Sequence, residues 1–200
     1  NHDSIREYIC NFIMSKLETN TIDTISGTTN LTIGSTNSST VTFENGAVTG
    51  HMYPAFEAYM SSNMTGISDV TDTKVQVNTE VFDTDNCYDN STNYRFTPTV
   101  AGKYFVYGKV HVDDAAGNMR NAQSLIYKNG STYTFSVVNF HSGDTTDGEA
   151  ASPNVCAVID MNGTSDYVEL YGLADLVSGT GNFLGSSSRP TTFGAYRIGA

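Results

Sequence analysis

The chain has 200 residues, of which 10 are Lys or Arg and 21 are Asp or Glu, so its formal net charge is −11 at pH 7. This length suits one domain with an extension, or two small domains. The acidic balance argues against nucleic acid as a partner, because a grip on phosphates needs Lys and Arg, and against an anionic membrane surface. No apolar run approaches the ~20 residues of a membrane-spanning helix, so no membrane insertion is expected.

Residues 1–19 are the only helix-like stretch. Ser4 and Glu7 fit a capping box at its start. Apolar residues recur there at the three-and-four spacing of one helical face: Ile5, Tyr8, Ile9, Phe12, Ile13 and Leu17. Three interpretations stay open: a short frayed helix, an anchor that bundles chains or holds a partner, or a leader that precedes a natural start at Met14.

Residues 20–53 have the pattern of a stem. Short apolar pairs recur about ten residues apart, first Leu31 with Ile33 and then Val41 with Phe43, and glycines separate them. Each piece is too short to bury its own face, so such units are stable only when they stack on one another or on other chains. The spacing favours a thin β-stem wound with other chains, and the alternative is a disordered Thr/Asn/Ser linker.

Residues 54–200 have the pattern of an all-β head. Alternating apolar positions occur in Lys74–Phe82, in Lys103–Asp113, in Val155–Ile159 and in Tyr167–Leu173. Turn signals, such as Asn129-Gly130, lie between the runs. Short strands spaced in this way, without a helical period, predict an antiparallel sandwich.

The outward-facing positions of two of these strands carry aromatic side chains. In the run from Lys103, the even positions form a core face, and the odd positions include Phe105 and Tyr107. In the later run, Tyr167 and Tyr171 lie opposite the inward-facing Val168 and its neighbour Leu170. A face that meets water is expected to be polar, so these aromatics predict a subunit interface. The alternative is a set of scattered exposed tyrosines.

Six segments resemble the head domain of complement C1q and the related tumour-necrosis-factor jelly rolls. They are Pro54–Ala58, Val81–Asp89, Tyr94–Tyr107, Leu125–Gly130, Ser165–Leu170 and Phe193–Ile198. The core of the match, Phe96–Tyr104, departs from the family in lacking a residue between Thr97 and Pro98. The resemblance implies a ten-stranded antiparallel jelly roll that forms a tight homotrimer. The interface residues expected from the aromatic faces and the closing strand are Phe105, Tyr107, Tyr167, Tyr171 and Phe193.

The stem supplies a second resemblance. Residues 21–35, followed by this head, are similar to structural proteins of marine tailed bacteriophages, which carry such heads on fibres, tail appendages or capsid decorations. This implies a virion protein, made in the bacterial host cytoplasm and attached to other virion proteins through its stem.

Residues suited to catalysis or to a metal are sparse. The four histidines lie in no recognised catalytic motif, and phosphate-loop and nucleophile-elbow motifs are lacking, so we expect no enzymatic activity and no cofactor. Three cysteines, Cys10, Cys87 and Cys156, form neither a disulfide framework nor a metal-ligand pattern. Weak calcium candidates are Asp83, Asp85 and Asp89, with Asp113 and Asp114 in another loop, although solvated acidic turns explain them better.

A ligand-binding surface is the remaining candidate site. Amide and aromatic side chains suit sugars, and ordinary loops use them equally. The candidates for an apical, glycan-reading surface are Tyr88, Asn90, Asn93, Tyr133 and the Gly/Ser-rich residues 178–188. The sequence therefore predicts a non-enzymatic, homotrimeric virion protein that binds a host-surface glycan or protein. The alternatives are a capsid decoration or cement protein that stabilises the shell, and a secreted bacterial C1q-like adhesin.

Overall fold

A computed structural model describes residues 52–114, 116–140 and 148–199, and this part of the chain is entirely β-structure and loops. It contains no helix able to span a membrane. The strands are β1 Ala55–Tyr59, β2 Met64–Ile67, β3 Thr73–Lys74, β4 Thr79–Asp83, β5 Tyr88–Asp89, β6 Arg95–Phe96, β7 Gly102–Lys109, β8 Val112–Asp113, β9 Met119–Lys128, β10 Ser131–Asn139, β11 Ala150–Ala151, β12 Asn154–Met161, β13 Val168–Leu176, β14 Gly181–Phe183 and β15 Thr192–Gly199.

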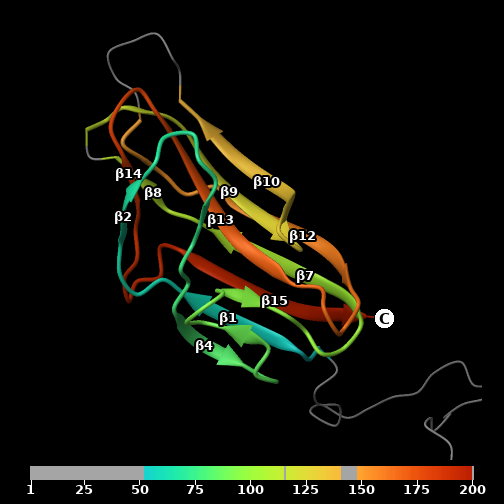
Figure 1. Ribbon diagram of the computed structural model, residues 1–200. Coiled ribbons are helices and arrows are strands. Elements are labelled where there is room, and N and C mark those ends of the chain that lie inside the picture. Colours follow the sequence, from blue (N-terminus) through green and yellow to red (C-terminus); the bar gives the residue numbers. More distant parts are fainter. Residues whose placement is uncertain (1–51, 115, 141–147, 200) are drawn as a thin grey trace, which may run out of the picture. The chain divides into compact units, whose positions relative to one another are not determined.

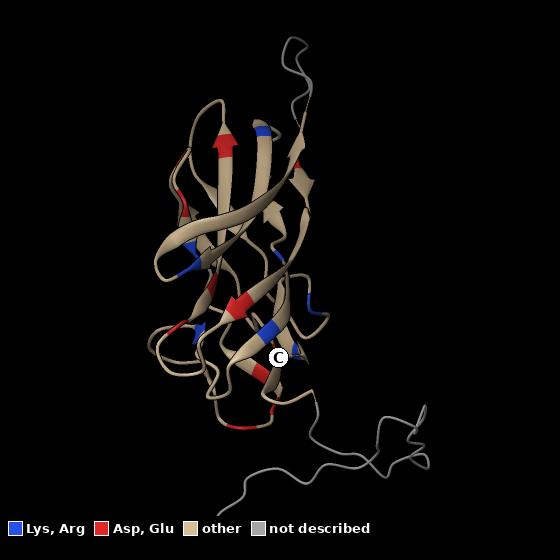
Figure 2. Cartoon of the chain, turned by 90° about the vertical axis from the view of Figure 1, so that its right-hand side faces the viewer, with Lys and Arg blue, Asp and Glu red and all other residues tan. Residues whose placement is uncertain are grey.

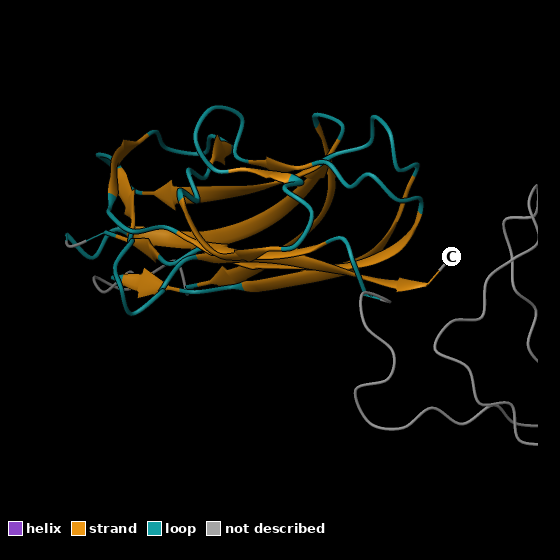
Figure 3. Cartoon of the chain, turned by 90° about the horizontal axis from the view of Figure 1, so that it is seen from below, coloured by secondary structure: helices purple, strands orange, loops and turns teal. Residues whose placement is uncertain are grey.

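The strands form an antiparallel jelly roll, as predicted, with two layers around one core (Figures 1 and 3). One sheet has the order β12-β7-β15-β1-β4. Another has the order β10-β9-β13-β6-β5, and β3 pairs with β13. A third sheet has the order β11-β8-β14-β2, and each of its strands adjoins, along the chain, the corresponding strand of the first sheet. The third sheet therefore continues the first beyond a bend, and such breaks produce fifteen segments where ten strands were predicted.

Thr191 stabilises this bend. Its side chain is fully buried; its Oγ1 accepts a hydrogen bond from the His111 N–H at 3.0 Å and donates one to the Leu184 carbonyl at 2.7 Å. Its own carbonyl accepts the Met60 N–H at 3.1 Å. One threonine thus satisfies buried backbone groups on three chain segments where strand pairing is interrupted.

The core confirms the predicted side-chain alternation of β7. Tyr104 and Val106 are fully buried, whereas Phe105 and Tyr107 are half-buried on the other face of the sheet. Stacked and edge-on aromatic rings fill the space between the layers, with neighbouring centroids 4.3 to 6.2 Å apart: Phe56, Tyr88, Phe96, Tyr104 and Phe193.

The hairpin predicted at Asn129-Gly130 is present between β9 and β10. Both turn residues have positive φ, 52° and 79°, which matches the tight turn that an Asn-Gly pair favours. The prediction of one continuous strand over Lys74–Phe82 is wrong, because β3 ends at Lys74 and β4 begins at Thr79. Val75 and Val77 between them still fill the core. The predicted N-terminal helix and β-stem lie outside the described residues.

Candidate functional site

The outer face of the five-stranded sheet carries a cluster of half-buried aromatic side chains, which we call the aromatic face: Tyr59, Phe105, Tyr107 and Tyr196. Tyr196 and Phe105 are cross-strand partners on β15 and β7, with ring centroids 5.5 Å apart. The rings of Phe105 and Tyr107 lie 6.1 Å apart along β7. A large apolar surface of this kind on a sandwich that already has a complete core is typical of an interaction site.

Tyr107 lies flat across the aromatic face because its cross-strand partner is Gly194. A Cβ at Gly194 would lie 2.4 Å from the Tyr107 ring, so only glycine leaves room for it. The phenol reaches beyond β15 and donates a hydrogen bond to the Glu57 carboxylate on β1 at 2.9 Å. Burial, followed by the bond to Glu57, raises the pKa of Tyr107 well above its usual value. Arg189 completes the rim, 3.5 Å from Glu57 and stacked over Tyr59.

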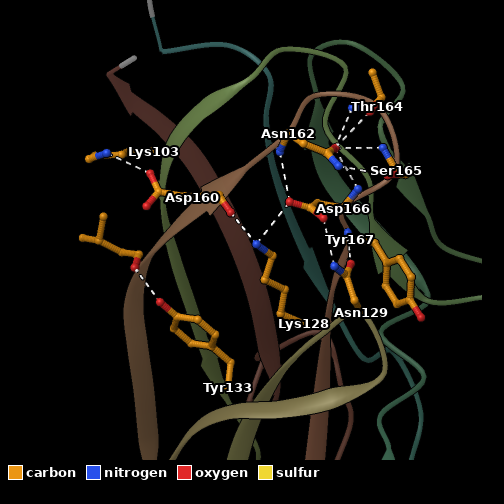
Figure 4. Close-up of polar contacts among 11 residues, drawn as sticks. Lys103, Lys128, Asn129, Tyr133, Asp160, Asn162, Thr164, Ser165, Asp166 and Tyr167 are labelled. Atoms are coloured by element: carbon orange, nitrogen blue, oxygen red, sulfur yellow. Dashed lines mark hydrogen bonds and ion pairs between the residues drawn. The ribbon is translucent and has the colours of Figure 1, made fainter.

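A second exposed apolar surface runs along the side of the sandwich where the two layers have their edge strands β10 and β12. We call it the β10–β12 flank, and its exposed residues are Tyr133, Phe135, Val137 and Val138. Val158 of β12 is the cross-strand partner of Phe105 and borders the aromatic face. The Tyr133 hydroxyl donates to the Val158 carbonyl at 3.4 Å and links the two edges (Figure 4). β10 carries no charged residue, and in Figure 2 the charges lie mainly at strand ends and in loops.

The predicted interface set does not lie on one surface. The inclusion of Phe193 was wrong, because this side chain is fully buried in the core, where it packs edge-on against Phe56. The register explains the error: Phe193 pairs with the core-facing Gly108, so the outward position three residues later belongs to Tyr196. Tyr196 was not predicted. Residues three apart in a strand face opposite sides of the sheet, so a buried Phe193 implies an outward Tyr196.

Tyr167 and Tyr171 were also misplaced relative to Phe105 and Tyr107. Both belong to the other layer, where Tyr171 stacks on Tyr127 at 3.9 Å between centroids and Tyr167 covers the Arg95 guanidinium. Their partners are residues of the same chain, which explains why aromatic residues occupy an outward face without a second subunit. The two pairs of aromatics therefore lie on opposite sides of the sandwich.

The predicted ligand-binding residues are likewise divided. Asn90 and Asn93 line a polar pocket of about 490 Å³ between β4 and β5, the edge strands on the side away from β10. Tyr133 lies on β10, at the opposite edge of the same sheet. Tyr88 borders the pocket, but its ring is 4% exposed and its hydroxyl donates to the Val77 carbonyl, so it is a core residue. One apical surface made of all these residues is therefore excluded within a single chain.

The remaining pocket residues were not among the ligand-binding residues predicted from the sequence. They are Glu80, Asn86, Cys87, Asp89, Ser91, Arg95 and Thr97. Arg95 escaped notice because the sequence does not show that Asp89 and Glu169, its cross-strand neighbours, bind other groups. Burial, and then the neighbouring Asp83, raises the pKa of Glu80 above its usual value.

The calcium candidates do not converge on one point. Among the described residues, no group of three His, Cys, Asp or Glu side chains is placed to hold a metal ion. Asp89 accepts hydrogen bonds from the N–H groups of residues 91–93 in its own turn, with Thr92 foremost, and these hold the pKa of its carboxyl far below the usual value. Asp114 likewise accepts N–H groups of its own loop.

A polar network fixes the loop that precedes β13 (Figure 4). The Asn129 side chain donates to Asp166 at 2.8 Å and accepts the Tyr167 N–H at 2.9 Å. Lys128 forms an ion pair with Asp166 at 3.1 Å. Asn162 accepts three successive N–H groups of residues 164–166. Together these bonds hold Tyr167 in place beside Arg95.

One contact has the residue types of a nucleophilic pair. Ser152 Oγ lies 2.7 Å from His111 Nδ1. A hydrolytic triad also needs a carboxylate on the second ring nitrogen to orient the imidazole, and in the part of the chain that the structure describes no carboxylate is hydrogen-bonded to His111. The pair links the segment between β11 and β12 to the bend after β7.

Comparison with known proteins identifies the fold. No family model matches the sequence, and no curated protein matches it either. The structure of Eiger TNF from S. frugiperda has a TM-score of 0.53 at 10% identity, over 74% of this chain and 94% of that one. Murine APRIL at pH 8.5 has a TM-score of 0.50 at 12% identity, and at pH 8.0 a TM-score of 0.51 at 11%; each covers 72% of this chain and 98% of that one. The chain therefore has a TNF-like jelly-roll fold.

Proposed function

We propose that this chain is a non-enzymatic homotrimeric binding protein, in which the aromatic face of one protomer packs on the β10–β12 flank of the next. The observation that carries the proposal is the aromatic face itself. Its four rings stay half-buried on a sheet whose other side is already covered by the core. An aromatic side chain buries ~150–250 Å² in all. Because part of each ring is already covered within the protomer, only the remainder would be added to the interface.

The arrangement of the two surfaces supports a closed ring. A contact between two different patches is heterologous, and it closes only if the patches are inclined to each other. A face and an adjoining flank of one sandwich meet this condition. Tyr167 and Tyr171 already stack on partners within the same chain, so they are not part of the proposed interface.

We assign this trimer to a bacteriophage virion, on the likeness of the stem sequence to phage structural proteins. Residues 20–53 would attach the heads to other virion proteins, and the heads would contact a glycan or protein of the host surface. Three copies of each site on one particle strengthen contacts that are weak singly, because the second and third bind at high effective concentration.

Immunogold labelling of virions, together with binding of the purified head to host cells, tests this role. We expect label at the tail or its fibres and cell binding that cell-surface polysaccharide competes away. Label over the capsid, with particles that lose stability but not infectivity when the protein is deleted, would indicate a decoration protein. Label on the bacterial surface and none on virions would indicate an adhesin and contradict the virion assignment.

A further inference from the structure

Arg95 lies between two carboxylates that do not pair with it. Its cross-strand partners are Asp89 on β5 and Glu169 on β13. Asp89 is saturated by the N–H groups of residues 91–93, and the 3%-exposed Glu169 forms an ion pair with Lys74 at 2.5 Å. Within the described residues, Arg120 and Arg189 form ion pairs, whereas Arg95 and Arg197 do not. The five N–H donors of Arg95 are therefore available to an external acceptor.

The Arg95 side chain is nevertheless held in position. Its guanidinium lies over the Tyr167 ring, 4.6 Å from the centroid. The backbone of Tyr167 is fixed by Asn129, which also binds Asp166 (Figure 4). A planar cation stacked on an anchored ring loses little conformational freedom when it binds a carboxylate, which makes Arg95 a preorganised anion-binding group.

The rest of the pocket is built for hydroxyl groups. Glu80, Asn86 and Asn90 line it, and no side-chain hydrogen bond occupies them among residues 52–114, 116–140 and 148–199. Cys87 and Tyr88, its least polar residues, are buried. A volume of about 490 Å³ accommodates one or two sugar rings and lies within the usual range of ligand sites.

We propose that this pocket binds an acidic sugar, a hexuronate residue of a polysaccharide. The sugar carboxylate would pair with the Arg95 guanidinium, which matches its two oxygens, and the hydroxyls would bond to Glu80, Asn86 and Asn90. A peptide carboxylate fits less well, because the pocket offers no exposed apolar side chain to receive a peptide side chain.

The pocket is independent of the proposed trimer interface. It shares no residue with the aromatic face or the β10–β12 flank, and it lies between β4 and β5, on the side away from that flank. The inference deepens the proposed function by naming a ligand class, and rests on that function only for its biological role. A Phe105→Asp monomer should therefore still bind the sugar, which separates failure of the trimer from failure of the pocket.

The test is an NMR titration of the full chain with methyl β-D-glucuronide and methyl β-D-glucoside, which differ only in the carboxylate. We expect shifts at the side-chain amides of Asn86 and Asn90 with the glucuronide, and binding at least about ten-fold weaker with the glucoside. No binding of the glucuronide, or equal binding of both sugars, would overturn the proposal. So would equally tight binding of N-acetylalanine, a carboxylate without sugar hydroxyls, which would indicate peptide capture.

Two variants locate the site. Arg95→Gln should abolish the preference for the glucuronide, and Asn90→Asp, in the turn after β5, should weaken its binding by repulsion. Arg120→Gln, at the distant Asp175 ion pair, is the matched control and should bind as the wild type does. Unchanged binding by a folded Arg95→Gln protein would show that the sugar binds elsewhere.

Discussion

Phe193 and Phe105 differ in role because they face opposite sides of one sheet. Phe193 is fully buried among aromatic rings, whereas Phe105 lies half-exposed on the aromatic face. We therefore expect Phe193→Ala to lower the free energy of unfolding by about 3–5 kcal/mol through the cavity it leaves. Phe105→Ala should affect assembly rather than the fold of the protomer. Urea unfolding of the monomeric Phe105→Asp protein with and without Phe193→Ala measures the cost of the cavity, and no difference between the two would contradict the assignment.

The hydrogen bonds to Asp89 predict a pH dependence. The N–H groups of its turn, Thr92 first, lower the pKa of its carboxyl in the folded state. Because the pKa of this carboxyl is lower in the folded than in the unfolded state, its ionised form stabilises the fold. This stabilisation is fully present above the unfolded-state pKa of about 3.9, and it is lost as the pH falls toward the folded-state pKa. Unfolding between about pH 6 and pH 3 should therefore show a smaller loss of stability on acidification for Asp89→Asn than for the wild type. Parallel curves would contradict this.

At the scale of elements, the bend between the two collinear sheets depends on Thr191. Replacing it with the isosteric valine leaves the His111 N–H and the Leu184 carbonyl without their partner. We expect Thr191→Val to lower the free energy of unfolding by about 1–3 kcal/mol per group left unpaired. Thr192→Val, at the half-buried next position, is the matched control and should change stability far less in the same unfolding experiment.

The strands themselves were predictable and their partners were not. Alternation along Lys103–Asp113 places Tyr104 in the core and Phe105 outside, because side chains of a strand point alternately to its two faces. The alternation of side chains along a strand does not determine which sheet the strand joins. Tyr171 was therefore grouped with Phe105, although it stacks on Tyr127 in the other layer.

The pocket was only partly predictable for a related reason. Asn90 and Asn93 stand out in the sequence as polar turn residues, and both line the pocket. Arg95 acquires its character from cross-strand neighbours that bind other groups, and Glu80 arrives from the other layer. Such long-range pairings depend on the register of the sheets, which composition and spacing do not determine.

In the whole molecule, each side of the sandwich would have a separate task. The aromatic face and the β10–β12 flank would join protomers, and the side between β4 and β5 would carry the sugar pocket. A charge placed on the flank should therefore break the assembly without affecting the pocket. We expect Phe135→Lys to yield a protomer-sized species in size-exclusion chromatography that still binds methyl β-D-glucuronide. A variant that stays trimeric would remove the flank from the interface.

Sedimentation equilibrium of the full chain at micromolar concentration tests the central claim most directly. We expect a single species of about 65 kDa, three times the 21.6 kDa of one chain, for the wild type and for Tyr171→Ser on the opposite face. We expect a species the size of one chain for Phe105→Asp. A wild-type protein that sediments as a single chain, or a Phe105→Asp protein that keeps the mass of the trimer, would contradict this claim.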